Sequence, residues 1–126
     1  MKKIFFSFLV AGLLSACGSN ESNTKTEAPK TADITKDPAY QKGVELEAKN
    51  DCKTCHTIDD KLTGPPFRDI ANKYAGYPDT IVTHLASKVR SGGSGVWGQI
   101  MMTPHPGLSQ EDAEAIVRYI LLLKNK

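Results

Sequence analysis

The sequence of 126 residues lacks a strong net charge, an alternating strand pattern and an apolar run that could span a membrane. Its 16 basic and 14 acidic residues leave a charge of +2, so we expect no nucleic-acid partner. No segment alternates apolar and polar residues, so no β-sheet is predicted. Methionine is also scarce, with three in the chain, and two of these are adjacent, Met101 and Met102. The helical periodicity that is present favours a small helical domain.

The first seventeen residues predict an exported lipoprotein. Lys2 and Lys3 precede an apolar run that is too short to span a bilayer and that ends in LSAC, Leu14 to Cys17. This order resembles the lipobox of bacterial lipoproteins, in which cleavage leaves a lipid-modified cysteine at the amino terminus. We therefore predict a lipoprotein signal peptide over residues 1–16 and a lipid on Cys17, which would anchor the domain to a bacterial membrane, facing the periplasm. The alternative is an ordinary cleaved signal.

Residues 17–36 are predicted to be the lipidated cysteine and a flexible tether. From Gly18 to Lys36 there is no aromatic residue, and Ile34 is the one strongly apolar side chain. Such a segment buries too little surface to offset its ordering entropy. A flexible chain of this length reaches about 20–25 Å.

The remaining residues, 37–126, are predicted to form one helical domain. Helical signals cover four segments: about 38–50, 67–74, 79–90, and a last helix after Ser109. Asp37 and Pro38 form a cap and first-turn pair, and Ser109 with Asp112 has the form of a capping box. The last helix carries an apolar stripe: Ala113, Ile116, Val117, Ile120 and Leu123. A core this thin gains from a staple or a cofactor.

The stretch CKTCH, with Cys52, Cys55 and His56, is the c-type haem attachment pattern. One helical turn brings the two thiols to the same side, where they can add to the two vinyl groups along one edge of a porphyrin. The adjoining His56 is then carried under the ring and can offer a nitrogen to iron. The pattern predicts one covalently bound haem c per chain.

Three other interpretations use the same residues. A thioredoxin-like pair would follow a strand, which the pattern does not show. A structural zinc site needs four ligands, and His84 and His105 do not form a recognisable second ligand pair. A plain disulfide between the two cysteines is the simplest alternative in an exported domain.

The segment Gly64, Pro65 and Pro66 suits the support of an axial histidine. Such a ligand needs an acceptor for its other ring nitrogen. Two successive prolines contribute carbonyls but no amide hydrogens, so the Pro65 carbonyl is left free for this role. A rigid turn that opens the next helix is the alternative, and both interpretations can hold together.

The other side of the iron would be open or filled by a further donor. A methionine there is typical of an electron carrier, and Met101 and Met102 lie together in GQIMMTPHP, a stretch for which neither helix nor strand is expected. Methionine as a gap filler in a small core is the alternative interpretation. His105 is another possible ligand.

The blocks CKTCH, GPPFRDIANKY and GGSGVWGQIMMTPHP, with the amphipathic last helix, resemble the small monohaem class I cytochromes c of bacteria, especially their short-chain respiratory carriers. The resemblance covers residues 40–124. It implies an all-α class I cytochrome c fold, about four helices around one covalently bound haem, and a cytochrome c domain at 37–126. It also implies that Cys52 and Cys55 hold the haem, that Pro65 supports the proximal His56, and that Met102 rather than Met101 is the distal ligand.

The same resemblance implies the surroundings and the role of the haem. The Trp97 indole would meet a haem propionate, with a plain core role as the alternative, and Lys88 or Arg90 would help to neutralise that group. Relatives often place an aromatic residue at the position of Ala48, where the first helix crosses the last; Leu46 or Tyr40 could substitute for it.

The implied function is electron transfer between a reductase and an oxidase, by a monomer that is not an enzyme. The alternative is a haem sensor or peroxidase-like protein with a displaceable distal ligand. An optical spectrum and carbon monoxide binding would distinguish the two.

Overall fold

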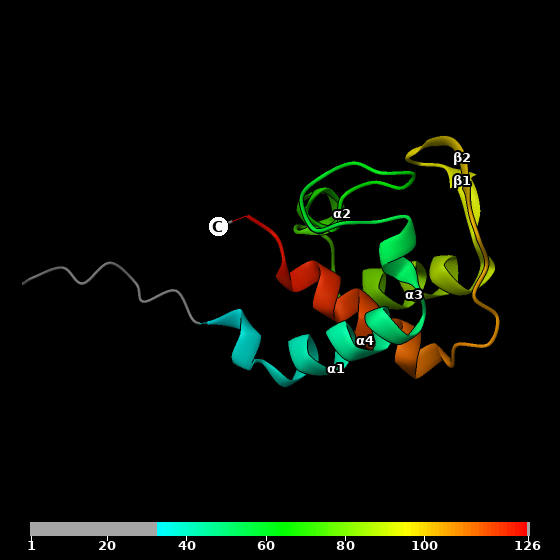
Figure 1. Ribbon diagram of the computed structural model, residues 1–126. Coiled ribbons are helices and arrows are strands. Elements are labelled where there is room, and N and C mark those ends of the chain that lie inside the picture. The colour runs from blue at the N-terminus through cyan, green and yellow to red at the C-terminus, as the bar shows by residue number, and fades with distance from the viewer. Residues whose placement is uncertain (1–32, 126) are drawn as a thin grey trace, which may run out of the picture. The chain divides into compact units, whose positions relative to one another are not determined.

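The computed structural model describes residues 33–125, so the predicted signal peptide, Cys17 and most of the tether lie outside the described residues. In this part the chain forms four α-helices and one small sheet (Figure 1). The elements are η1 (Ile34–Lys36), α1 (Pro38–Lys49), η2 (Cys52–Thr54), α2 (Phe67–Tyr74), α3 (Thr80–Ser91), β1 (Gly93–Gly95), β2 (Gly98–Met102) and α4 (Gln110–Leu122). No helix between residues 33 and 125 is long and apolar enough to cross a membrane.

The helix starts are fixed by the caps that the sequence predicts. The Asp37 side chain accepts a hydrogen bond from the Ala39 amide at 2.8 Å, and Pro38 occupies the first turn of α1. At α4 the Ser109 hydroxyl accepts from the Asp112 amide at 3.0 Å. These bonds satisfy amides that a helix terminus leaves without partners, so the predicted four-helix, mostly helical fold is confirmed.

The described part of the chain includes a short turn, η1, before the predicted boundary at residue 37. The Asp33 side chain accepts from the Thr35 amide at 3.1 Å and caps the short turn η1. Ile34, the one strongly apolar residue of the predicted tether, packs against the core. This partial burial of Ile34 helps to hold residues 34–36 in the turn.

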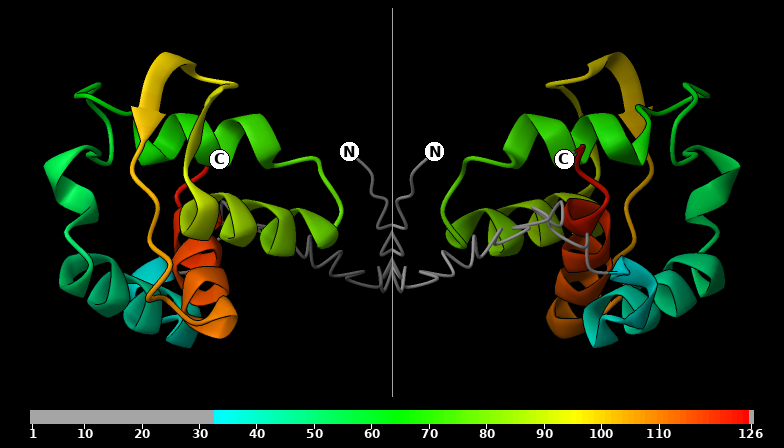
Figure 2. Two further views of the ribbon diagram at one scale, coloured as in Figure 1. Left: turned by 90° about the vertical axis from the view of Figure 1, so that its right-hand side faces the viewer. Right: turned by 90° about the vertical axis from the view of Figure 1, so that its left-hand side faces the viewer.

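Helix α4 lies at the centre of the domain, with α1, α2 and α3 packed against it (Figure 2). Its predicted stripe is buried: Ala113, Ile116, Val117, Ile120 and Leu123. These residues join two apolar clusters, one with Phe67 of α2 and one with Val82 of α3. The amphipathic pattern of the last helix therefore predicted the core correctly.

Helices α1 and α4 cross at Gly43, where Tyr40 packs edge-on against Tyr119, as expected for a substitute for the aromatic residue of relatives. A Cβ atom on Gly43 would overlap the Tyr119 side chain and lie 2.7 Å from the Ala115 carbonyl, so the two backbones approach closely. Ala48 is exposed, and Glu47 is buried in its place. The reason is helical geometry. Glu47 follows Tyr40 by seven residues, which is nearly two turns, so it lies on the same face of the helix. Ala48 follows by eight residues and is rotated about 80° away from that face.

The hairpin β1–β2 contradicts the expectation that GQIMMTPHP forms neither helix nor strand. Residues 98–102 pair antiparallel with residues 93–95, in the register Gly93 with Met102 and Gly95 with Gly98. The sequence pattern missed this sheet because β1 is Gly-Ser-Gly, which has no apolar side chains to alternate. The hairpin is nevertheless too small to change the helical fold class.

Candidate cofactor site

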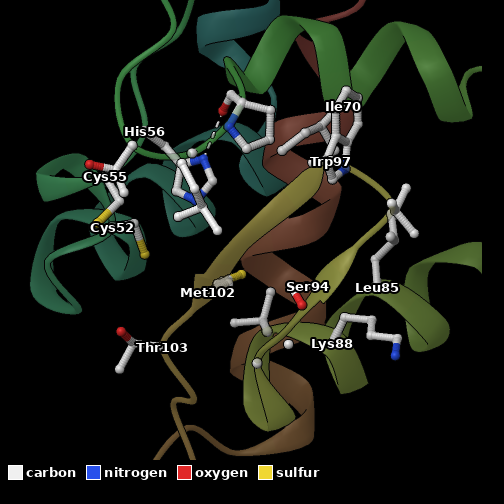
Figure 3. A pocket seen from close by; sticks show the side chains of 18 of the residues that line it. Cys52, Cys55, His56, Ile70, Leu85, Lys88, Ser94, Trp97, Met102 and Thr103 are labelled. Carbon is white, nitrogen blue, oxygen red and sulfur yellow. Dashed lines mark hydrogen bonds between the residues drawn. The ribbon is translucent and has the colours of Figure 1, made fainter.

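A cavity of about 420 Å³ opens between η2, α2, α3, the β1–β2 hairpin and α4 (Figure 3). Its apolar wall comes from α3 and α4: Leu85, Val89, Ile116, Val117 and Ile120. The volume is within the range of about 300–1,000 Å³ that is usual for small-molecule and cofactor sites. The inner face of α4 thus serves both as core and as a wall of the cavity.

His56 enters this cavity with its orientation fixed by two contacts. Its Nδ1 lies 2.7 Å from the Pro65 carbonyl oxygen, as the sequence predicts. A carbonyl oxygen only accepts, so Nδ1 carries the proton and Nε2 keeps a free lone pair. The imidazole also stacks on the Phe67 ring, with centroids 5.2 Å apart and an interplanar angle of 12°. The side chain is 8% exposed and is therefore held as a rigid donor.

The chain around His56 turns tightly to make this arrangement. The His56 amide donates to the Cys52 carbonyl at 3.0 Å, which closes the turn that contains the CKTCH motif. The Gly64 amide then donates to the Cys55 carbonyl at 2.8 Å and returns the chain to the imidazole. A Cβ on Gly64 would overlap the ring and lie 2.7 Å from Nδ1, so a larger residue would displace the histidine.

Cys52 and Cys55 are both half-buried and line the cavity beside His56 (Figure 3). They are free thiols that are not joined to each other. Burial, followed by the negative charge of Glu47, raises the pKa of the Cys52 thiol to about 11. A redox-active thiol needs a lowered pKa, so this environment does not fit a thioredoxin-like pair.

The hairpin places the two adjacent methionines differently. Met102 ends β2, is half-buried and is seen at the cavity in Figure 3. Met101 also borders the cavity but is 67% exposed. Successive side chains of a strand point to opposite faces, which accounts for the difference. Met102 is therefore the better placed of the two for a buried contact in the cavity.

Trp97 lies at the tip of the hairpin and is 42% exposed. It borders the cavity, as does Lys88 of α3. The Lys73 ammonium lies 5.5 Å from the centroid of the Trp97 ring, within the range of a cation–π interaction. Lys88 thus places positive charge at the cavity, while Lys73 lies against Trp97, which borders it.

Arg90 is not among the residues that line this cavity. Its Nε donates to the Leu108 carbonyl at 2.9 Å, and Nη1 donates to the Gln110 side chain at 3.4 Å. The guanidinium therefore ties α3 to the start of α4. The prediction that Arg90 neutralises a bound anionic group has no support in this geometry.

The two remaining histidines do not complete a zinc site with the cysteines. In the described part of the chain no three His, Cys, Asp or Glu side chains are close enough together to hold a metal ion. His105 is half-buried at the cavity, with its amide donating to the Val89 carbonyl at 3.2 Å, and His84 is exposed. The cavity therefore brings together the two thiols, the His56 imidazole and the Met102 thioether, with His105 and Met101 also at its border.

This donor set fits a covalently bound haem. Two thiols one turn apart can form thioethers, and an imidazole with a free Nε2 can bind iron from one side. The thioether of Met102 belongs to a different segment of the cavity, and the walls between are apolar. Sequence reasoning missed two nearby charges, those of Lys73 and Glu47. The Lys73 contact depends on the hairpin, but the seven-residue spacing from Tyr40 could have indicated that Glu47 is buried.

Comparison with known proteins agrees with this site. The family model for cytochrome c matches residues 40–124. Cytochrome c-552 of Nitrosomonas europaea is 46% identical over 84 residues, which cover 67% of this chain and 81% of that protein. Cytochrome c-551 of Azotobacter vinelandii is 44% identical over 82 residues, or 65% of this chain and 98% of that protein.

The fold is also similar to that of a solved relative. The crystal structure of wild-type Nitrosomonas europaea cytochrome c552 has a TM-score of 0.60 and 47% sequence identity. The match covers 64% of this chain and 99% of that one. Sequence family and three-dimensional fold thus agree over the same domain.

Proposed function

This chain belongs to the cytochrome c family of electron carriers, and we propose that His56 and Met102 are the two axial ligands of its haem iron. The haem c, bound covalently through the CKTCH motif, supplies one-electron chemistry between the ferrous and ferric states. The polypeptide supplies the ligands, the orientation and the exclusion of water. The chain itself carries out no substrate chemistry.

The observation that carries the proposal is the hydrogen bond from His56 Nδ1 to the Pro65 carbonyl. It fixes the tautomer with the lone pair on Nε2 and increases the basicity of that nitrogen. Stacking on Phe67 keeps the ring from rotating away. His56 is therefore prepared as a ligand before any metal is bound.

Met102 supplies the second ligand in this proposal. Its half-buried thioether borders the cavity, whereas Met101 on the same strand is mostly exposed. A thioether is a soft donor that favours the ferrous state, and it fills the site against other ligands. Such ligation suits a carrier that exchanges electrons without binding a substrate.

The anionic side of the haem would be met by Trp97 at the tip of the hairpin and by lysines of α2 and α3. Trp97 can donate from its indole nitrogen, and Lys88 borders the cavity with an ammonium group. The Lys73 ammonium lies against the Trp97 ring and adds positive charge there. Together these groups offset the burial of negative charge.

Electron exchange would occur at the apolar rim of the cavity. Val96 and Ile100 are each 62% exposed, and both border the cavity together with Met101. A small apolar patch of this kind supports weak, transient docking. We therefore propose that a reductase and an oxidase, the respiratory partners of a monomeric carrier, dock at this rim in turn.

The location of the carrier is proposed from its N-terminal sequence. The LSAC motif supports cleavage before Cys17 and a lipid on that residue, which would tether the domain to a membrane on the periplasmic side. The test is fractionation of cells that express the full chain. Cys17→Ala should release the protein from the membrane fraction, and retention of this variant there would contradict the anchor.

The axial ligands are tested by replacing Met102 and Met101 separately with alanine in the haem-loaded protein. The ferric protein should show the weak absorption band near the red end of the spectrum that methionine-sulfur ligation produces. Met102→Ala should abolish this band, and the matched control Met101→Ala should retain it. Loss of the band in Met101→Ala alone would refute the assignment.

Carbon monoxide binding separates the carrier from the sensor or peroxidase-like alternative. Met102 as a ligand would leave no open position on the iron, so the reduced protein should bind carbon monoxide slowly. Met102→Ala should bind it rapidly. Equally rapid binding by the parent protein would favour the alternative function.

A further inference from the structure

Glu47 is a charged residue in the apolar centre of the domain. It is 0% exposed and is among the three largest side chains that are fully buried, with Tyr119 and Ile116. Neither carboxylate oxygen has a hydrogen-bond partner within residues 33–125. Burial of a carboxylate without hydrogen bonds is unfavourable by several kcal/mol in general terms, so this position calls for a physical reason.

One cation lies close to this carboxylate. The Lys53 ammonium is 3.3 Å from Glu47 Oε2, an ion pair whose geometry does not amount to a hydrogen bond. Lys53 lies between the two cysteines of the CKTCH motif and is 61% exposed. The pair therefore connects the buried face of α1 to the segment that carries the haem-attachment thiols.

The negative charge of Glu47 acts on groups on two other elements. It is the second cause, after burial, that raises the pKa of the free Cys52 thiol to about 11. It is also the second cause, again after burial, that raises the pKa of Tyr119 on α4 to about 12. The Lys53 charge is screened by water, whereas the buried carboxylate is screened much less. The net field of the pair at Cys52 is therefore negative.

We infer that Glu47 lowers the reduction potential of the haem, because its buried negative charge lies beside the attachment residue Cys52 while its counter-ion Lys53 faces solvent. The inference rests on the electron-carrier function proposed above. Reduction adds one electron, delivered by a protein reductase, and it neither forms nor breaks a bond. A fixed negative charge nearby opposes this electron. Glu47 acts through space as a positioning and tuning residue and does not touch the iron.

The test compares four variants of the haem-loaded protein by equilibrium redox titration at one pH. Glu47→Gln keeps the shape and removes the negative charge, so the midpoint potential should rise. Lys53→Met removes the compensating positive charge, so the potential should fall by a smaller amount. The matched controls are Glu45→Gln and Lys49→Met, an exposed ion pair on the same helix. Neither control should move the potential measurably.

Opposite signs separate electrostatic tuning from a structural role. Loosened packing would expose the haem in both variants and shift both potentials in the same direction, and that result would overturn the inference. An unchanged potential in Glu47→Gln would overturn it as well. The rise should also persist at high salt, because a buried charge is poorly screened. If the rise in midpoint potential of Glu47→Gln disappeared at high salt, the effect would come from exposed charges and not from the buried carboxylate.

If Glu47→Gln does not yield folded holoprotein, the Lys53→Met variant still tests the inference. Lys53 is mostly exposed, so Lys53→Met keeps the fold, and an unchanged or raised potential in that variant would overturn the inference. The ferric sulfur band is recorded on the same samples. Absence of the band in the parent protein would refute the Met102 ligand, while the comparison of potentials among the variants would still stand.

Discussion

The two sides of the cavity differ in how firmly they are built. On one side His56 is 8% exposed and is held by Pro65, Phe67 and the close approach of Gly64. On the other side Met102 ends a hairpin whose residues 93–101 are all exposed. The histidine side belongs to the core of the domain, whereas the methionine side is a surface feature.

The histidine side continues as a chain of aromatic contacts into the helix crossing. Phe67 meets the Tyr119 ring edge-on at 6.3 Å, and Tyr119 meets Tyr40 in the same manner at 5.1 Å. The hairpin side has instead the single cation–π contact of Lys73 with Trp97. This difference indicates that changes on the histidine side alter stability, while changes on the hairpin side alter reactivity.

The largest expected effect follows from filling the space at Gly64. Gly64→Val would force its Cβ into the His56 ring and destabilise the domain by about 1–3 kcal/mol, as overpacking does. In a domain of this size each kcal/mol lowers Tm by about 4–8 °C, which thermal unfolding of the holoprotein would measure. The control is Gly76→Val, because a Cβ there meets nothing within 4 Å. Equal losses in both variants would contradict the rigid histidine side.

A smaller effect is expected at alkaline pH from Tyr119. Burial first, and then the charge of Glu47, raises the pKa of this phenol to about 12 from the usual 10.0. The folded state therefore keeps the proton that the unfolded chain loses. This contribution to stability is complete below pH 10 and is lost as the pH rises toward 12.

Tyr119→Phe should therefore flatten the fall in Tm between pH 10 and 12, relative to the parent protein. Tyr77→Phe is the control, because Tyr77 is 56% exposed and lies outside the core. The same flattening in Tyr77→Phe would show that the alkaline loss does not arise from the aromatic chain.

The smallest effect on stability is expected at the hairpin. A change there should instead lower the rate of electron exchange. Ile100→Ser removes an apolar side chain that is 62% exposed and borders the cavity. The free energy of unfolding should change by no more than about 0.5 kcal/mol. The rate of electron exchange with a redox partner should fall by up to about fivefold. Stopped-flow kinetics would measure this rate.

Leu62→Ser is the matched control for the hairpin, because Leu62 is 49% exposed but does not border the cavity. Its exchange rate should equal that of the parent protein. An equal loss of rate in both variants would remove the argument that partners dock at the cavity rim.

The sequence by itself determined the helices, their caps and one side of the site. Caps, apolar stripes and the CKTCH turn depend on residues within about ten positions of one another, and so does the support that Pro65 gives to His56, nine residues away. Such contacts depend on neighbours along the chain, which a linear pattern records. The family resemblance added the choice of Met102 over Met101, which stays a prediction until the spectra are measured.

Only the tertiary structure decided which residues meet across elements. It buried Glu47 and left Ala48 exposed, turned Arg90 toward Leu108, and placed Lys73 against Trp97. It also formed a hairpin where a loop was expected. These outcomes depend on which face each helix turns toward the core and on how the glycine-rich strand β1 pairs with β2. The physical reason is that packing in space, and not spacing along the chain, decides which residues are buried and which segments pair.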